Sequence, residues 1–111
     1  MSMNVWVKCG RVYNLVAEDG VTTTTTGNGL FKDAPKATMQ ASVAGTGSVS
    51  ATVLIDFSND NANWINGGTI TLSGTTSATD GFTTDASWKY VRARVTAVSG
   101  TGATVKVLMG V

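Results

Sequence analysis

Residues 48–57, SVSATVLIDF, decide the fold class of this chain. Apolar residues stand at every second position of the stretch, and the residues between them are mostly polar. Successive side chains of a β-strand point to opposite faces, so this period of two predicts a strand with one buried face. A shorter run with the same period, 38–43, precedes it across a Gly45-Thr46-Gly47 loop. We expect the two runs to pair as a hairpin, with Val43 opposite Val49.

Two further alternating runs lie near the C-terminal end, at 90–97 and 103–109, on either side of Gly100-Thr101-Gly102. Matching their apolar faces predicts a second hairpin, in which Arg94 lies directly opposite Lys106. The loop has five residues in each predicted hairpin. We interpret the hairpins as two similar units of one sandwich.

The composition supports a fold made of strands. Thr, Ser and Gly make up 40 of the 111 residues, Val is the commonest apolar residue with 14 copies, and there is one Glu. A helical bundle needs Leu, Glu, Lys and Ala in quantity, so this class is excluded. Turn clusters such as 58–63 and 74–80 separate the apolar runs, which add up to about seven or eight strands. We predict an all-β fold, an antiparallel β-sandwich of the jelly-roll kind.

The N-terminal third lacks a long alternating pattern. Thr22 to Thr26 form a five-threonine tract beside Gly27 and Gly29, which buries too little apolar surface to fold alone. We therefore divide the chain into an N-terminal arm or irregular segment, 1–33, and a β-sandwich domain, 34–111.

The arm is expected to become ordered against a neighbouring subunit. Trp6 and Tyr13 would then be partner-binding residues, because large aromatic side chains fill pockets at interfaces. The alternative is that Val5 to Val16 forms an ordinary strand pair of the sandwich.

Catalytic and metal-binding residues are scarce. The chain has no His and one Cys, which removes the commonest general base and any thiolate cluster. Asp80 and Asp85 could form an acid–base pair, but they flank a loop rather than a concave site. Asp56, Asp60 and the nearby asparagines could offer oxygen ligands to calcium, although turn formation explains them better. We expect no enzyme activity, no cofactor and no metal.

Charge and aromatic residues point to protein partners. The net charge is +1 and 14% of the residues are charged, so we expect neither a nucleic acid nor a membrane as partner. No apolar stretch typical of a signal peptide stands near residue 1. Trp64, Trp88 and Tyr90 could stack on a sugar, but core or interface packing is favoured. Arg92, Arg94 and Lys106 share one predicted outward face, which an acidic partner surface would favour.

Several stretches of the last two thirds of the chain resemble a known family. These are VLIDFSND at 53–60 with Asn63-Trp64, Asp80-Gly81-Phe82, WKYVRARV at 88–95, SGTGA at 99–103 and VLMGV at 107–111. Together they are similar to capsid decoration proteins, also called staple or cement proteins, of short-tailed bacteriophages like phage epsilon-fifteen. The resemblance covers about residues 38–111.

The resemblance implies a jelly-roll-like fold, no catalysis, and attachment to the outer surface of the icosahedral capsid of the virion. Such proteins clamp neighbouring copies of the major capsid protein, and further copies of the chain itself would be neighbours. We expect synthesis in the host cytoplasm. Two alternatives stay open: a tail-fibre or receptor- and carbohydrate-binding β module, and a minor head–tail structural component.

Overall fold

The computed structural model describes residues 11–32 and 34–111, which form nine β-strands. No helix in these residues is long and apolar enough to cross a membrane. The strands are β1 (Val12–Asn14), β2 (Thr25–Thr26), β3 (Leu30–Phe31), β4 (Ala37–Ala44), β5 (Val49–Ser58), β6 (Ile65–Gly74), β7 (Ser77–Thr84), β8 (Tyr90–Ser99) and β9 (Thr104–Gly110).

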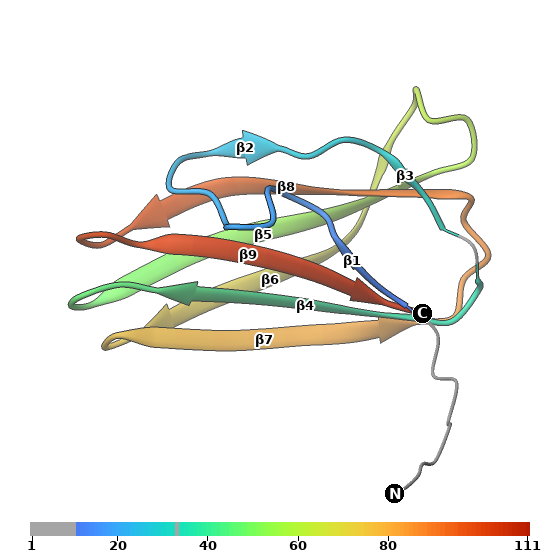
Figure 1. Cartoon of the computed structure of the whole chain (residues 1–111). Coiled ribbons are helices and arrows are strands. Elements are labelled where there is room, and N and C mark those ends of the chain that lie inside the picture. Colours follow the sequence, from blue (N-terminus) through green and yellow to red (C-terminus); the bar gives the residue numbers. More distant parts are fainter. Residues whose placement is uncertain (1–10, 33) are drawn as a thin grey trace, which may run out of the picture.

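The strands form two antiparallel sheets that face each other (Figure 1). Sheet A has the order β1-β9-β4-β7, and sheet B has the order β2-β8-β5-β6, with β3 also paired to β8. The pairs are nested: β5 with β6 is innermost, followed by β4 with β7, then β2 and β3 with β8, and finally β1 with β9. Successive nested pairs alternate between the sheets, as when one long hairpin is rolled up into a jelly roll. The predicted all-β sandwich is confirmed.

The core lies between the sheets and is built from the inward positions of the alternating runs. On β5 every inward residue is buried, from Val49 to Phe57. Sheet A contributes Met39, Val105 and Met109 to the same core, and all three are buried. Burying one such large apolar side chain stabilises the fold by roughly 1.5–3 kcal/mol. The alternating pattern therefore gives each sheet one apolar face, as predicted from the sequence.

The two predicted hairpins are wrong. β4 hydrogen-bonds to β7 and β9, and β5 to β6 and β8, so 38–43 and 49–57 lie in different sheets. The same holds for β8 and β9. Two consecutive strands with matching apolar faces can bury them by lying face to face across a core as well as side by side. The chain takes the first solution, so each Gly-Thr-Gly loop is an arch between the sheets.

This arrangement also separates two cations that were expected to be neighbours. Arg94 pairs with Leu54 in sheet B, whereas Lys106 pairs with Ser42 in sheet A. Their predicted placement on one outward face is therefore wrong. The two side chains point away from opposite sides of the sandwich, and no like-charge repulsion between strand neighbours arises.

The arch loops meet at one end of the molecule, where β4, β6 and β8 end (Figure 1). The backbone N–H of Thr46 donates to the carbonyl of Thr101 over 3.1 Å, so the two Gly-Thr-Gly loops contact each other directly. The loop between β6 and β7 also crosses from one sheet to the other and forms a third arch. The backbone N–H of Gly45 donates to the carbonyl of Thr76 in this loop over 2.9 Å. Small residues suit this position because the three loop backbones approach closely.

Residues 11–31 run along the edge of the sandwich formed by β9 of sheet A and β8 of sheet B. β1 pairs with β9, Val21 exchanges two hydrogen bonds with Val105, and β2 pairs with β8. Leu15 is buried in the core. We predict from the sequence that the threonine tract orders only against a neighbour; in the structure its last two residues, Thr25 and Thr26, pair with β8 of the same chain. Trp6, which the sequence analysis predicts to bind a partner, lies outside the described residues.

Lys32, at the end of this N-terminal segment, holds it to the rest of the sandwich through a buried side chain. Its side chain is buried, and Nζ donates to the carbonyls of Ala34, Pro35 and Ala86 over 2.7, 2.6 and 2.8 Å. Burial lowers the pKa of this amine, and the positive charge of Lys89 acts in the same direction. The three carbonyls compensate the cost of burial, and these bonds join Lys32, Ala34 and Pro35 to the chain that enters β8.

The Gly-Thr-Gly arches give a matched pair of variants. Gly100 has a φ of 122°, and a Cβ there would lie 2.6 Å from the carbonyl oxygen of Ser48. We expect Gly100→Ala to lower the free energy of unfolding by about 1–3 kcal/mol. At Gly47 a Cβ meets nothing within 4 Å, so Gly47→Ala should change it by less than about 0.5 kcal/mol. Urea unfolding measures both; equal effects would contradict the arch geometry.

Candidate interaction surface

The outer face of sheet B carries a buried carboxylate between two arginines. Asp56 on β5 points outward because its neighbours Ile55 and Phe57 point into the core. Arg92 on β8 lies directly opposite Asp56, and Arg94 lies one outward position further along. The alternation that builds the core thus also gathers three charged side chains on the opposite face.

Both oxygens of Asp56 accept hydrogen bonds from these arginines. Nε of Arg92 donates to Oδ2 over 3.0 Å, Nε of Arg94 donates to the same oxygen over 2.5 Å, and Nη2 of Arg94 donates to Oδ1 over 3.1 Å. The Asp56 side chain is 2% exposed, whereas those of Arg92 and Arg94 are 25% and 33% exposed. The hydrogen bond to Asp56 raises the pKa of Arg94 above its ordinary value.

Trp64 covers one of the arginines. The chain leaves β5, turns through 59–64, and brings the Trp64 ring to 4.5 Å from Cζ of Arg92. A guanidinium over the face of an indole ring is attracted by its negative face. Gly29 packs beside the same ring, and a Cβ there would lie 3.0 Å from two of its carbons. The strand segment at β3 and the β5–β6 loop therefore hold Trp64 in place together.

A second pair of rings continues the surface. Phe31 on β3 lies opposite Tyr90 on β8, and their centroids are 5.9 Å apart in an edge-to-face arrangement. Phe31 is 60% exposed, which is unusual for so large an apolar side chain. We call Phe31, Trp64, Tyr90, Arg92 and Arg94, together with Asp56 beneath them, the aromatic–arginine face.

The loop beside this face is shaped by Asp60. Its Oδ1 accepts from the backbone N–H groups of Ala62 and Asn63 and from the Ser58 hydroxyl, and its Oδ2 accepts from the Asn63 amide. Asn61 has a φ of 57°, a left-handed conformation that asparagine tolerates. The carboxylate thus forms turns, as the sequence analysis preferred over a calcium site. Across 11–32 and 34–111, no group of three His, Cys, Asp or Glu could hold a metal ion.

The structure brings together three of the seven residues predicted to bind a partner. Trp64, Arg92 and Arg94 share the aromatic–arginine face. Trp88 instead stacks on Phe57 at 6.5 Å and closes one end of the core. Tyr13 packs against the core from β1, and Lys106 is exposed on sheet A. Trp6 is not among the described residues.

Two members of the face were missed by sequence reasoning. Phe31 follows Leu30 in an apolar pair between a glycine-rich stretch and Lys32, which is too short for a periodic pattern to mark it. Asp56 was weighed only as a calcium ligand. A signal for it existed: a carboxylate at an outward position in the middle of an apolar run needs a basic partner on the neighbouring strand.

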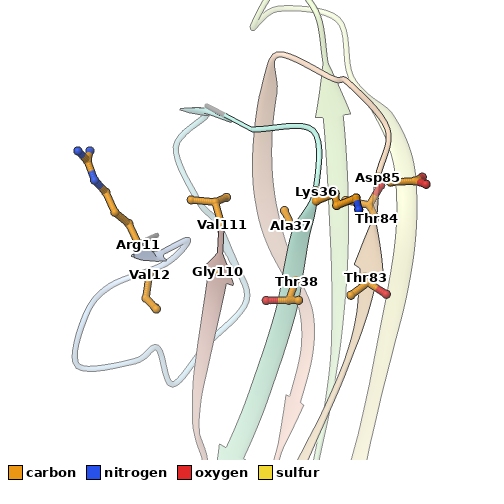
Figure 2. A pocket seen from close by; sticks show the side chains of 10 residues that line it. All are labelled: Arg11, Val12, Lys36, Ala37, Thr38, Thr83, Thr84, Asp85, Gly110 and Val111. Atoms are coloured by element: carbon orange, nitrogen blue, oxygen red, sulfur yellow. The ribbon is translucent and has the colours of Figure 1, made fainter. Parts of the chain in front are cut away.

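A separate cleft of about 790 Å³ crosses one end of sheet A (Figure 2). Val12, Gly110, Thr38 and Thr83 form a register row across its floor. Figure 2 shows Lys36, Thr84 and Asp85 on one side and Arg11 with Val111 on the other. Asp85 lines this cleft, whereas Asp80 lies further along β7 opposite Ala41. The cleft holds none of the residues that the sequence analysis predicted as partner-binding.

Comparison with known proteins gives likeness in fold. No protein-family model and no curated protein sequence matches the chain. Among solved structures, the SPBc2 prophage-derived protein YomS matches with a TM-score of 0.58 and 14% identity, over 96% of this chain and 98% of that chain. The PBSX exported protein XepA matches with a TM-score of 0.59 and 12% identity, over 96% of this chain and 38% of that chain. At these identities the likeness shows the fold alone.

Replacing Asp56 tests whether the aromatic–arginine face is held together from below. We expect Asp56→Asn to lower the free energy of unfolding by about 2–4 kcal/mol, because it leaves two half-buried guanidinium groups without their counter-charge. Asp80→Asn removes an exposed carboxylate from β7 and should cost less than about 0.5 kcal/mol. Thermal and urea unfolding measure both. A loss no greater than that of Asp80→Asn would mean that Asp56 does not organise the face.

Acid should loosen the 58–63 loop through Asp60. Hydrogen bonds from Asn63, Ala62 and Ser58 hold the pKa of Asp60 well below its usual range. A carboxyl whose folded pKa is depressed contributes stability above its unfolded pKa, and this is lost as the pH falls below it. Between about pH 5 and about pH 2 the wild type should therefore lose more stability than Asp60→Asn, which does not titrate. Parallel urea midpoints across this range would contradict the prediction.

Proposed function

We propose that this chain is a structural protein of a bacteriophage particle. The observation that carries the proposal is the fold likeness to the prophage-derived protein YomS, which spans nearly the whole of both chains. The sequence resemblance to phage decoration proteins, which covers about residues 38–111, supports the same class independently. The fold likeness rests on backbone geometry, whereas the sequence resemblance rests on residue identity.

More specifically, we propose that it decorates the outer surface of the icosahedral capsid and staples neighbouring major capsid subunits. A decoration protein needs a compact body, a near-neutral surface and one rigid face for its partner. The nested sandwich is the compact body, and the net charge of +1 keeps the surface near neutral. The aromatic–arginine face provides aromatic and arginine side chains of the kind that dominate the binding energy of interfaces. Many weak attachments then oppose capsid opening together, provided that each copy touches two subunits.

The proposal includes the partners and the place of action. The major capsid protein and further copies of this chain are its neighbours, with no nucleic acid and no membrane bound directly. The chain is made in the host cytoplasm and joins the outer surface of the virion. No catalytic role is proposed, because the chain has no His and Asp80 and Asp85 occupy different positions on and after β7.

A second candidate is a carbohydrate- or receptor-binding module of a tail. The exposed ring of Phe31 and the half-buried ring of Trp64 favour it, since aromatic faces stack on sugars. The fold also occurs within a longer chain, because only 38% of XepA is covered. A minor head–tail component is a third arrangement with the same fold requirement.

Copy number separates these functions. We expect purified virions, measured by quantitative mass spectrometry against the major capsid protein, to hold on the order of hundreds of copies of this chain, as the symmetry of an icosahedral shell requires. A tail module or head–tail component should be present at roughly 3–18 copies. Added in excess to shells that lack it, the purified chain should co-sediment with them until saturation. Absence from virions would reject the whole proposal.

A further inference from the structure

We propose that the aromatic–arginine face binds a carboxylate side chain of a partner protein, at the terminal nitrogens of Arg92 beside the Trp64 ring. This inference rests on the proposed function only for the identity of the partner, the major capsid protein. Its chemistry rests on three properties of the face: charge, unused hydrogen-bond donors and apolar walls.

The face carries a positive charge that the fold does not neutralise. Arg92 and Arg94 contribute two positive charges, and Asp56 contributes one negative charge, so one positive charge remains. Asp56 is the one carboxylate among the outward strand residues of sheet B that the structure describes, and the nearby Asp60 is occupied by its own loop. A partner with negative charge complements this surface.

Arg92 keeps hydrogen-bond donors available. Its Nε is used by Asp56, whereas within the described part of the chain its two terminal nitrogens have no protein acceptor. The Asp56 bond and the Trp64 ring fix the plane of the guanidinium, so these donors are presented in a set direction. A fixed planar fork of N–H groups matches the two oxygens of a carboxylate. One quarter of the Arg92 side chain remains exposed, which leaves the fork reachable.

The rings around Arg92 favour a side chain of a protein over other anions or sugars. Trp64 and Tyr90 flank it on the same face, and Phe31 extends the apolar surface. Such rings pack on the methylene stem of Asp or Glu and on its apolar neighbours, and they lower the local dielectric around the pair. One net charge is too little for a nucleic acid backbone. A neutral sugar needs acceptors as well as donors, and the charged fork offers donors alone.

Shell binding by matched variants tests the inference. Arg92→Met keeps an apolar stem against Trp64 and removes the charge and the donors, while Lys106→Met removes one charge from sheet A. We expect Arg92→Met to weaken binding to shells that lack the chain by about 30-fold or more, the range for losing a buried, hydrogen-bonded charge pair. Lys106→Met should stay within about twofold of the wild type. Equal binding by all three proteins would overturn the inference and leave the capsid function standing.

A second measurement works without shells, so failure of the proposed function does not decide the matter. Hexaglutamate is titrated into the ¹⁵N-labelled wild-type chain while the Trp64 indole N–H and the Arg92 Nε–H are followed by NMR. We expect saturable shifts of both signals with hexaglutamate, abolished by Arg92→Met and kept by Lys106→Met. Shifts spread over the whole surface would overturn the inference. So would shifts of Trp64 with an N-acetylglucosamine oligomer and none with hexaglutamate, which would support the sugar-binding candidate.

Discussion

The rest of the structure depends on the register of β5. Its inward row fills the middle of the core, and its backbone is hydrogen-bonded on both sides by the long strands β6 and β8. Asp56 lies between two inward residues of this strand. A slip by one residue would turn this carboxylate into the core and the apolar row into solvent. Burying an unpaired carboxylate is so unfavourable that this one residue excludes the neighbouring register.

The outer side of the same strand explains why the aromatic–arginine face is rigid. Asp56 fixes Arg92 and Arg94, and Arg92 in turn lies under Trp64. These anchors, apart from Trp64, stand on the central strands of sheet B rather than on loops. Their backbone positions are therefore set by the core. The binding proposed for this face would therefore cost little conformational entropy, because its side chains are already ordered.

The nested pairing also decides how the sheet edges are treated. Residues 11–31 cover the outer edges of β9 and β8, so two strands that would otherwise expose backbone N–H and C=O groups are paired. Exposed edges promote unwanted association between copies, and the pairing of these two edges prevents it. The short strands β1 to β3 thus serve the fold even though each buries little.

Much of this could be predicted from the sequence, and the reasons are local. Composition and the period of two along 38–57 and 90–109 determined an all-β sandwich and most of its core, because alternation depends only on neighbouring residues. The outward placement of Arg92 and Arg94 on their strand also followed from the alternation, whereas the contact of Arg92 with Trp64 did not. What only the tertiary structure decided was which strands pair and what meets across them. Identical alternation permits a hairpin or an arch, so β4 and β5 were assigned to one sheet although they lie in two. The hydrogen bonds from Arg92 and Arg94 to Asp56 join positions 36 and 38 residues apart. A local sequence pattern cannot indicate contacts over such separations. The local sequence determines which side chains of a strand point into the core and which point outward. The long-range pairing of strands decides which of these side chains lie next to one another.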